Sequence, residues 1–173
     1  MTAEVRCVAL LGPRGAGKTT LAPVLARILG WAAADGDDLL AARAGVPAGT
    51  FLQQVGEERF RMLEEEVTAA ALARKTPQVL ALGGGAVLGP RVEAALRQPF
   101  VLPVLLLAPL PVLVARLQAA PRPGLTSLPP AAEIELLLQR RLQLYRSLAR
   151  LELDTSSLDP ESCAQAIVAA LRS

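Results

Sequence analysis

Two patterns of apolar and polar residues alternate along the chain, and they predict different elements. Five short apolar segments carry no helical period and are typical of strands, at residues 5–11, 31–34, 78–82, 100–107 and 151–154. Each is followed by a segment in which apolar residues recur every three or four positions. This alternation predicts an α/β fold, a three-layer α/β/α arrangement in which a five-stranded parallel sheet is covered on both faces. A length of 173 residues fits one domain, residues 1–173.

The helical pattern predicts seven helices, at residues 18–29, 39–44, 57–73, 90–97, 109–118, 133–150 and 160–171. A glycine-rich break is expected at residues 45–49. In the long helix over residues 57–73, the face turned to the core is expected to carry Phe60, Leu63, Val67, Ala70 and Ala71.

Prolines mark two unusual places. Residues 119–132 hold four of them and are too long for a simple connection, so we expect a lid over a site, with a disordered loop as the alternative. Pro103 lies inside an expected interior strand, where proline forfeits a ladder hydrogen bond, and we expect a bulge there.

One stretch carries the strongest chemical signal. Residues 12–20 fit the pattern G-x-x-x-x-G-K-[ST] directly after the first expected strand and before the first expected helix. In such a loop, backbone N–H groups turn toward the phosphates of a nucleotide, a lysine reaches their oxygens, and a hydroxyl ligates Mg²⁺. The residues predicted to bind the nucleotide here are Gly15, Ala16, Gly17, Lys18, Thr19 and Thr20.

The ends of two further strands carry groups suited to catalysis. In open α/β sheets, ligands bind beyond the carboxyl ends of the strands. Asp35 and Asp37 follow the second strand, where one acid can face Mg²⁺ and the other a substrate hydroxyl; alternatively, Asp37 or Asp38 caps a helix beginning at Leu39. Residues 83–85 are three glycines after the third strand, either backbone donors for a polar ligand or a flexible turn.

Composition narrows the function. The chain has no histidine, so acid–base chemistry falls to a carboxylate. A net charge of +2, scattered arginines and few aromatic residues do not describe a nucleic-acid binder. The absence of asparagine excludes the N-K-x-D motif by which GTPases read guanine, and no apolar strand ends in Asp-Glu, as motor-type ATPases require.

Other features bear on location. The apolar run over residues 100–115 contains three prolines and is shorter than the ~20 residues of a membrane span, and the N-terminus lacks the pattern of a signal peptide. Cys7 and Cys163 are far apart in apolar surroundings, which favours two buried reduced thiols. We therefore expect a cytoplasmic protein without a membrane or nucleic-acid partner.

Six motifs in order along the whole chain resemble shikimate kinase. They are residues 12–20, 35–37, the pattern G-E-x-x-F-R-x-x-E over residues 56–64, L-G-G-G-A-V over residues 82–87, Arg122-Pro123, and R-x-x-x-Y from Arg141 to Tyr145. This resemblance implies the P-loop fold of nucleoside monophosphate kinases, with a substrate-binding helical region at about residues 35–63 and the lid at 119–132. It also implies transfer of the γ-phosphoryl group of ATP to the 3-hydroxyl of shikimate with Mg²⁺, by a monomer.

The resemblance further implies a role for each matching residue. Lys18 and the loop bind the phosphates, Thr19 ligates the metal, Asp35 supports it, and Asp37 hydrogen-bonds the attacking hydroxyl as base or orienter. The residues implied to bind shikimate or ATP elsewhere are Arg61 and Arg141 on the carboxylate, Gly83, Gly84 and Gly85 on the ring hydroxyls, Phe60 as an apolar wall, Arg116 on adenine, and Arg122 of the lid on the transferring phosphoryl group. Arg61 and Arg141 also lie at positions where each could be a solvated surface charge.

The chain departs from the family at several positions. Gly36 stands between the two acids where Thr or Ser is usual, and Ala81 replaces a Ser that commonly precedes the glycines. Ala41, Leu52, Gly124 and Leu158 are further departures. Two alternatives remain open, namely another small-molecule kinase such as one of the gluconate type, and a catalytically silent nucleotide-binding homologue.

Overall fold

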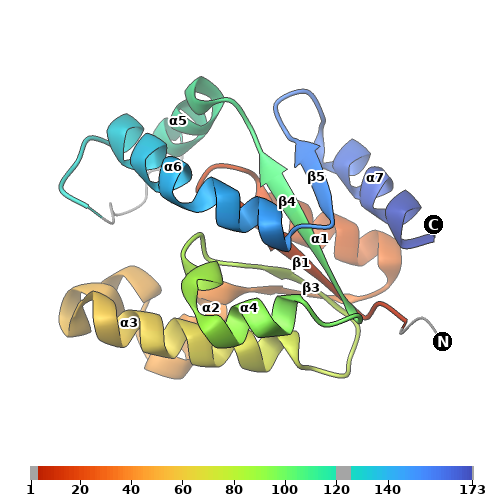
Figure 1. Cartoon of the computed structure of the whole chain (residues 1–173), viewed down its shortest axis with the longest axis horizontal. Coiled ribbons are helices and arrows are strands. Elements are labelled where there is room, and N and C mark those ends of the chain that lie inside the picture. Colours follow the sequence, from red (N-terminus) through yellow and green to blue (C-terminus); the bar gives the residue numbers. More distant parts are fainter. Residues whose placement is uncertain (1–3, 120–125, 173) are drawn as a thin grey trace.

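A parallel five-stranded sheet forms the centre of the computed structural model, which describes residues 4–119 and 126–172 (Figure 1). The strand order is β2-β3-β1-β4-β5, and every pairing is parallel. The strands are β1 (Cys7–Leu11), β2 (Ala32–Asp35), β3 (Gln78–Ala81), β4 (Val101–Leu107) and β5 (Leu151–Asp154). All five predicted strands are confirmed within two residues at each end.

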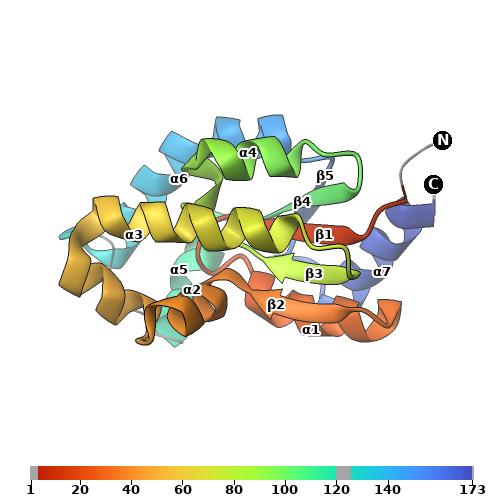
Figure 2. The same ribbon diagram turned by 90° about the horizontal axis from the view of Figure 1, so that it is seen from below.

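Seven α-helices and one 3₁₀ turn are found in the described residues. They are α1 (Lys18–Leu29), α2 (Gly36–Ala44), α3 (Ala48–Leu72), η1 (Ala86–Leu88), α4 (Pro90–Leu96), α5 (Leu110–Ala119), α6 (Pro130–Leu148) and α7 (Pro160–Arg172). Helix α1 lies beside α7 (Figure 1), and α4 lies beside α3 (Figure 2). None of the helices in the described part of the chain has the length and hydropathy that crossing a membrane requires.

The central strand β1 shows why the fold has three layers. Its five residues are all buried, and successive side chains point to opposite faces of the sheet. Val8 and Leu10 pack into a cluster with α1, α5 and α7, whereas Cys7, Ala9 and Leu11 pack into a second cluster with α3, α4 and the end of α6. The predicted three-layer arrangement is confirmed, and both cysteines are buried free thiols, as expected.

Helix α3 differs most from its prediction. It begins at Ala48 instead of residue 57, and Gly56, with φ 80° and ψ 170°, breaks its helical geometry without ending it. The predicted inward face is also partly wrong, because Ala70 is exposed and Leu63 and Val67 are half-buried. In their place Glu64 and Thr68 are buried, so the inward face carries polar groups that a pattern of apolar residues does not reveal.

Two other helices begin earlier than predicted. Helix α2 starts at Gly36 because the Asp35 side chain accepts a hydrogen bond from the Asp37 backbone N–H, which makes Asp35 the N-cap. The alternative that Asp37 or Asp38 caps the helix is therefore wrong. Helix α6 starts at Pro130, so the last part of the predicted lid is helical, while residues 120–125 with Arg122 lie outside the described residues.

Pro103 lies in β4 without a bulge, contrary to our expectation. The register between β1 and β4 is unbroken, with Ala9 opposite Pro103 and Leu10 opposite Val104. The Pro103 carbonyl accepts from the Arg150 N–H on the other side, where β5 pairs only from Val104 onward. Because a residue's N–H and C=O point to the same side of a strand, the missing N–H falls where no ladder partner is needed.

Candidate active site

A cavity of about 760 Å³ lies at the carboxyl ends of the strands, where all the sequence motifs were expected to meet. Its walls come from the phosphate loop, the start of α2, both halves of α3, the glycine turn after β3, the last part of α5, the segment after β5 and the start of α7. Among the residues named above, those that line it include Gly15, Ala16, Gly17, Lys18, Thr19, Thr20, Asp35, Asp37, Asp38, Leu52, Phe60, Arg61, Glu64, Gly83, Gly84, Gly85, Arg116, Leu158 and Cys163.

The phosphate loop has the backbone geometry that its glycines were expected to provide. Gly12, Gly15 and Gly17 all have positive φ, and a side chain on Gly12 would overlap the Leu106 carbonyl of β4. Lys18 folds back, and its Nζ donates to the carbonyls of Gly12 at 2.7 Å and Pro13 at 2.8 Å. The loop thus places an ammonium group and the N-terminus of α1 at one end of the cavity.

Thr19 and Asp35 lie together beside this loop. The Thr19 hydroxyl donates to Asp35 Oδ2 at 2.8 Å, while Asp35 Oδ1 accepts from the Asp37 N–H at 2.9 Å. One carboxylate therefore joins the phosphate loop to the start of α2. Hydroxyl and carboxylate oxygens are suitable Mg²⁺ ligands, and Mg²⁺ bound to a nucleotide needs only a few of them from the protein. In the described part of the chain, no group of three or more Asp, Glu, Cys or His side chains is arranged so that it could hold a metal ion.

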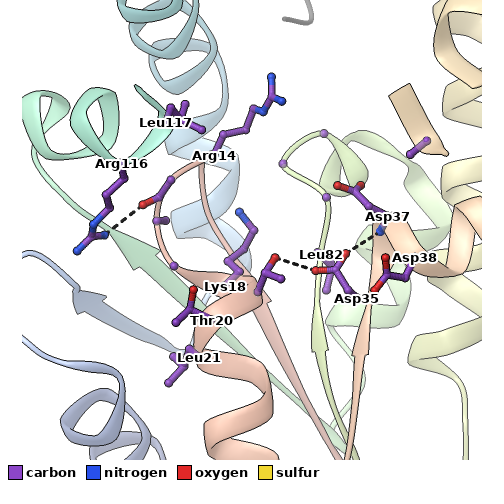
Figure 3. Close-up of a pocket in the computed structure, with 18 of the residues that line it drawn as sticks. Arg14, Lys18, Thr20, Leu21, Asp35, Asp37, Asp38, Leu82, Arg116 and Leu117 are labelled. Carbon is purple, nitrogen blue, oxygen red and sulfur yellow. Dashed lines mark hydrogen bonds between the residues drawn. The ribbon is translucent and has the colours of Figure 1, made fainter. Parts of the chain in front are cut away.

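Asp37 lies across the cavity from the nucleotide side. Lys18 lies between Arg116 on one side and Asp37 on the other (Figure 3). Asp38, the next residue, also lines the cavity but is exposed. The first turn of α2 therefore presents a carboxylate opposite the lysine that was predicted to reach the phosphates.

Arg61 is held by two acidic side chains. It forms ion pairs with Glu64 at 2.5 Å and, through Nε, with Glu57 at 3.7 Å, and its side chain is 22% exposed. Its Nε atom is buried and has no hydrogen-bond partner within the described residues. Arg61 is therefore not the solvated surface charge that we considered as an alternative.

The three glycines lie close to charged side chains. A side chain on Gly85 would overlap the Arg61 guanidinium, and one on Gly83 would meet Glu64 Oε1 at 2.7 Å, so these two glycines allow Arg61 and Glu64 their present positions. A side chain at Gly84 would lie at an ordinary contact distance, 3.6 Å, from both Arg141 Nη1 and the Tyr145 hydroxyl. Close approach of Arg61 and Glu64 thus accounts for Gly83 and Gly85, and the turn alternative stays open for Gly84.

Arg141 does not line the large cavity; it lies on α6 beside Gly84. It is 8% exposed and donates to the Tyr145 hydroxyl, which in turn donates to the Gly84 carbonyl. The alternative of a solvated surface arginine is wrong for Arg141 as well. Burial raises the pKa of the Tyr145 hydroxyl, against an opposing effect of Arg141, so this hydroxyl stays protonated as a donor.

Glu64 is the acidic counterpart of this group. Burial raises the pKa of its carboxyl group, the nearby Arg61 lowers it, and the charge of Asp37 raises it further. Two arginines and two carboxylates thus meet within one desolvated region. Sequence reasoning gave Glu64 and Tyr145 no role, although both stand in the motifs quoted above, at i+3 from Arg61 and i+4 from Arg141, where helical neighbours meet.

The opposite end of the cavity is formed around Arg116. Its Nη1 donates to the Gly15 carbonyl at 3.1 Å and to the Thr155 hydroxyl at 2.9 Å, and its Nη2 donates to the Thr155 carbonyl at 2.6 Å. Leu117, Leu158, Pro160 and Cys163 line the cavity nearby. This end is mostly apolar beside the phosphate loop, as a nucleotide base requires. Thr155 had no predicted role.

Comparisons with known proteins agree with this geometry. The shikimate kinase family model matches residues 14–172. Shikimate kinase of Saccharopolyspora erythraea is 40% identical over 169 residues, covering 94% of this chain and 91% of the relative, and that of Thermobifida fusca is 41% identical over 164 residues, covering 91% and 90%.

A comparison with solved structures also finds shikimate kinase. Shikimate kinase from Acinetobacter baumannii in complex with shikimate superposes with a TM-score of 0.89 at 30% identity, covering 97% of this chain and 93% of that one. A gluconokinase from Sinorhizobium meliloti shares the fold alone, with a TM-score of 0.65 at 17% identity. The chain therefore belongs to the shikimate kinase family.

Proposed function

We propose that the protein transfers the γ-phosphoryl group of ATP to the 3-hydroxyl of shikimate, giving shikimate 3-phosphate and ADP. The observation that carries the proposal is one cavity with two chemically different halves. A phosphate loop with Lys18 lines one half, and Asp37, Arg61 and the three glycines line the other. A kinase for a small carboxylate-bearing alcohol needs both halves in one enclosure.

The donor half binds ATP. The N–H groups of residues 15–20 and the Lys18 ammonium hold the phosphates, and Lys18 exchanges its bonds to the Gly12 and Pro13 carbonyls for phosphate oxygens. Arg116, braced against the Gly15 carbonyl, bounds the adenine subsite. Arg122 in the lid stabilises charge on the transferring group, a role that stays a prediction because the residue lies outside the described ones.

The residues available for Mg²⁺ are Thr19 and Asp35, whose side-chain oxygens lie 2.8 Å apart beside the phosphate loop. The hydroxyl oxygen would ligate the ion, and the carboxylate would hold its water shell. When bound, Mg²⁺ would neutralise part of the charge of the phosphates.

The acceptor half binds shikimate and orients the attacking hydroxyl. Asp37 accepts a hydrogen bond from the 3-hydroxyl and takes its proton as the O–P bond forms. Arg61, which lines the cavity, and Arg141, which lies close behind Gly84, bind the carboxylate. The backbone of Gly83, Gly84 and Gly85 contacts the ring hydroxyls, and Phe60 and Leu52 bound the apolar side of the ring.

We further propose that the working unit is a monomer of one domain in the cytoplasm, with residues 35–63 as the substrate-binding region and the segment around Arg122 as the lid. Support comes from the cavity, whose two halves are both supplied by one chain.

The test is ADP release by purified protein with ATP, Mg²⁺ and shikimate. We expect turnover that requires all three. Gluconate is the control acceptor, because it also carries a carboxylate and hydroxyl groups but on an open chain instead of a ring; turnover with gluconate alone would overturn the acceptor assignment. ADP binding without turnover on either acceptor would favour the catalytically silent homologue.

A further inference from the structure

Thr155, the residue directly after β5, has a buried hydroxyl with three polar neighbours. The side chain is 7% exposed, and its Oγ1 lies 3.0 Å from the Ala16 carbonyl, 3.2 Å from the Leu107 carbonyl and 2.9 Å from Arg116 Nη1. A hydroxyl has one proton to donate and can accept in return. It therefore accepts from Arg116 and donates to a carbonyl, of which that of Ala16 is the nearer.

The contact with Ala16 fixes one peptide of the phosphate loop. In a planar trans peptide, the carbonyl and the following N–H point in opposite directions. A hydrogen bond that holds the Ala16 carbonyl toward Thr155 therefore turns the Gly17 N–H away from Thr155. Gly17 lines the cavity, and with a φ of 97° it has the left-handed backbone conformation that this hydrogen bond helps to hold.

Arg116 binds the carbonyl of the preceding loop residue, Gly15. Its Nη1 donates to the Gly15 carbonyl as well as to Thr155 Oγ1, and its Nη2 donates to the Thr155 carbonyl. Two consecutive loop carbonyls, those of Gly15 and Ala16, are thus bound from behind by Thr155 and Arg116. The backbone of Thr155 is itself fixed, because its N–H donates to the Leu107 carbonyl at 2.8 Å.

We propose that Thr155 is a positioning residue of the phosphoryl-donor site: its hydroxyl orients the Ala16–Gly17 peptide and the Arg116 guanidinium for the nucleotide. The inference rests on the proposed use of this loop for ATP but not on the identity of the acceptor. Thr155 acts through the loop and through Arg116, so its loss should weaken nucleotide binding more than it slows phosphoryl transfer.

The test removes the hydroxyl at nearly constant shape. Thr155→Val should raise the Kd for ADP, measured by calorimetry without shikimate, and the KM for ATP by about tenfold, because the Ala16 carbonyl and Arg116 each lose a buried partner. The KM for shikimate should change by less than about twofold, since no acceptor residue contacts Thr155. Thr155→Ser, which keeps the hydroxyl, should stay within about threefold of the parent.

Controls separate positioning from packing. Thr68→Val removes the hydroxyl of a buried threonine on α3, outside the donor half, and should leave the Kd for ADP unchanged. If Thr155→Val does not fold, Thr155→Ala compared with Thr155→Ser isolates the hydroxyl again. The inference is overturned if Thr155→Val or Thr155→Ala binds ADP as tightly as Thr155→Ser does, whatever happens to thermal stability.

The two proposals can fail separately. A protein that binds ADP in a manner dependent on Thr155 but leaves shikimate unphosphorylated would refute the proposed acceptor and support this inference. If the protein phosphorylates shikimate and Thr155→Val keeps the parent's Kd for ADP and KM for ATP, the proposed acceptor is supported and this inference is refuted.

Discussion

The two halves of the cavity are built on different principles. The phosphate-binding part of the donor half is one contiguous stretch, residues 12–20, that is expected to bind mainly through backbone N–H groups and is braced from behind by Thr155 and Arg116. The acceptor half is assembled from three separate segments, namely α2, α3 and the turn after β3, with Arg141 of α6 close behind Gly84. Charged groups in it pack on one another, as Arg61 does on Glu64.

This difference predicts different sensitivities to mutation. Most donor-half substitutions leave the backbone N–H groups in place, so the effect should be on nucleotide affinity and of moderate size. In the acceptor half, one substitution can leave a buried charge without its partner, which is costly in a desolvated region. We therefore expect the largest effects on turnover and on shikimate affinity in the acceptor half.

The sharpest test of that asymmetry is Asp37→Asn. It keeps the shape of the side chain but removes the proton acceptor, so kcat should fall by about 10²- to 10⁴-fold, the usual contribution of a general base. Asp38→Asn, which changes the exposed carboxylate next to it, is the matched control and should cost less than about tenfold. Steady-state kinetics with both substrates distinguishes the two variants. A large loss of kcat in Asp38→Asn alone would mean that Asp38, and not Asp37, is the base.

Arg141 and its neighbour Arg140 offer a second matched pair. Arg141→Ala should raise the KM for shikimate by about 10- to 100-fold with a smaller change in kcat, because a charge-assisted hydrogen bond to the carboxylate is lost. Arg140 is exposed on the same helix, and Arg140→Ala should leave both constants nearly unchanged. Equal effects of the two substitutions would argue against any role of Arg141 in shikimate binding.

The donor half could be predicted from sequence almost completely, because its signal is local. The loop pattern fixes the boundary between β1 and α1, and the predicted helix over residues 18–29 has the bounds of α1. What could not be predicted there is Thr155, which is distant in sequence and meets Ala16 only because parallel strands end at one edge of the sheet.

The acceptor half could be predicted only in part. The motif supplied Arg61 and the three glycines, yet periodicity pointed to Leu63 and Val67 as core and missed the buried Glu64. A buried charge is invisible to a pattern of apolar residues, because it is tolerated only when a partner from elsewhere in the fold compensates it. The same limit applies to Pro103, whose place depends on where β5 begins to pair.

The proposed metal site lies between the two halves, and Asp35→Asn tests it. Asparagine is as good an N-cap as aspartate, so α2 should be retained while the negative charge beside Thr19 is lost. The Mg²⁺ concentration for half-maximal activity should rise about tenfold, within the range typical of outer-shell metal partners. Titrating Mg²⁺ at saturating ATP measures it. An unchanged Mg²⁺ requirement would remove Asp35 from the metal site.

The smallest expected effect concerns the stability of the acceptor half and its dependence on pH. Burial raises the pKa of Glu64 above its ordinary value of 4.5, so the folded protein holds this proton more tightly than the unfolded chain does. The stability that Glu64 contributes is therefore complete below about pH 4.5 and is lost as the pH rises through the raised pKa. Glutamine does not titrate, so this loss is absent from Glu64→Gln.

The measured quantity is the Tm of Glu64→Gln minus that of the parent, which should rise as the pH is raised above about 4.5. The ion pair with Arg61 forms only when Glu64 has lost its proton, so its effect is already part of the pKa shift and of this slope. Glu58→Gln changes an exposed carboxylate on the same helix and should give a flatter difference. A difference that falls with pH would mean that Arg61 outweighs burial, and the acceptor half would then gain stability from its buried charges.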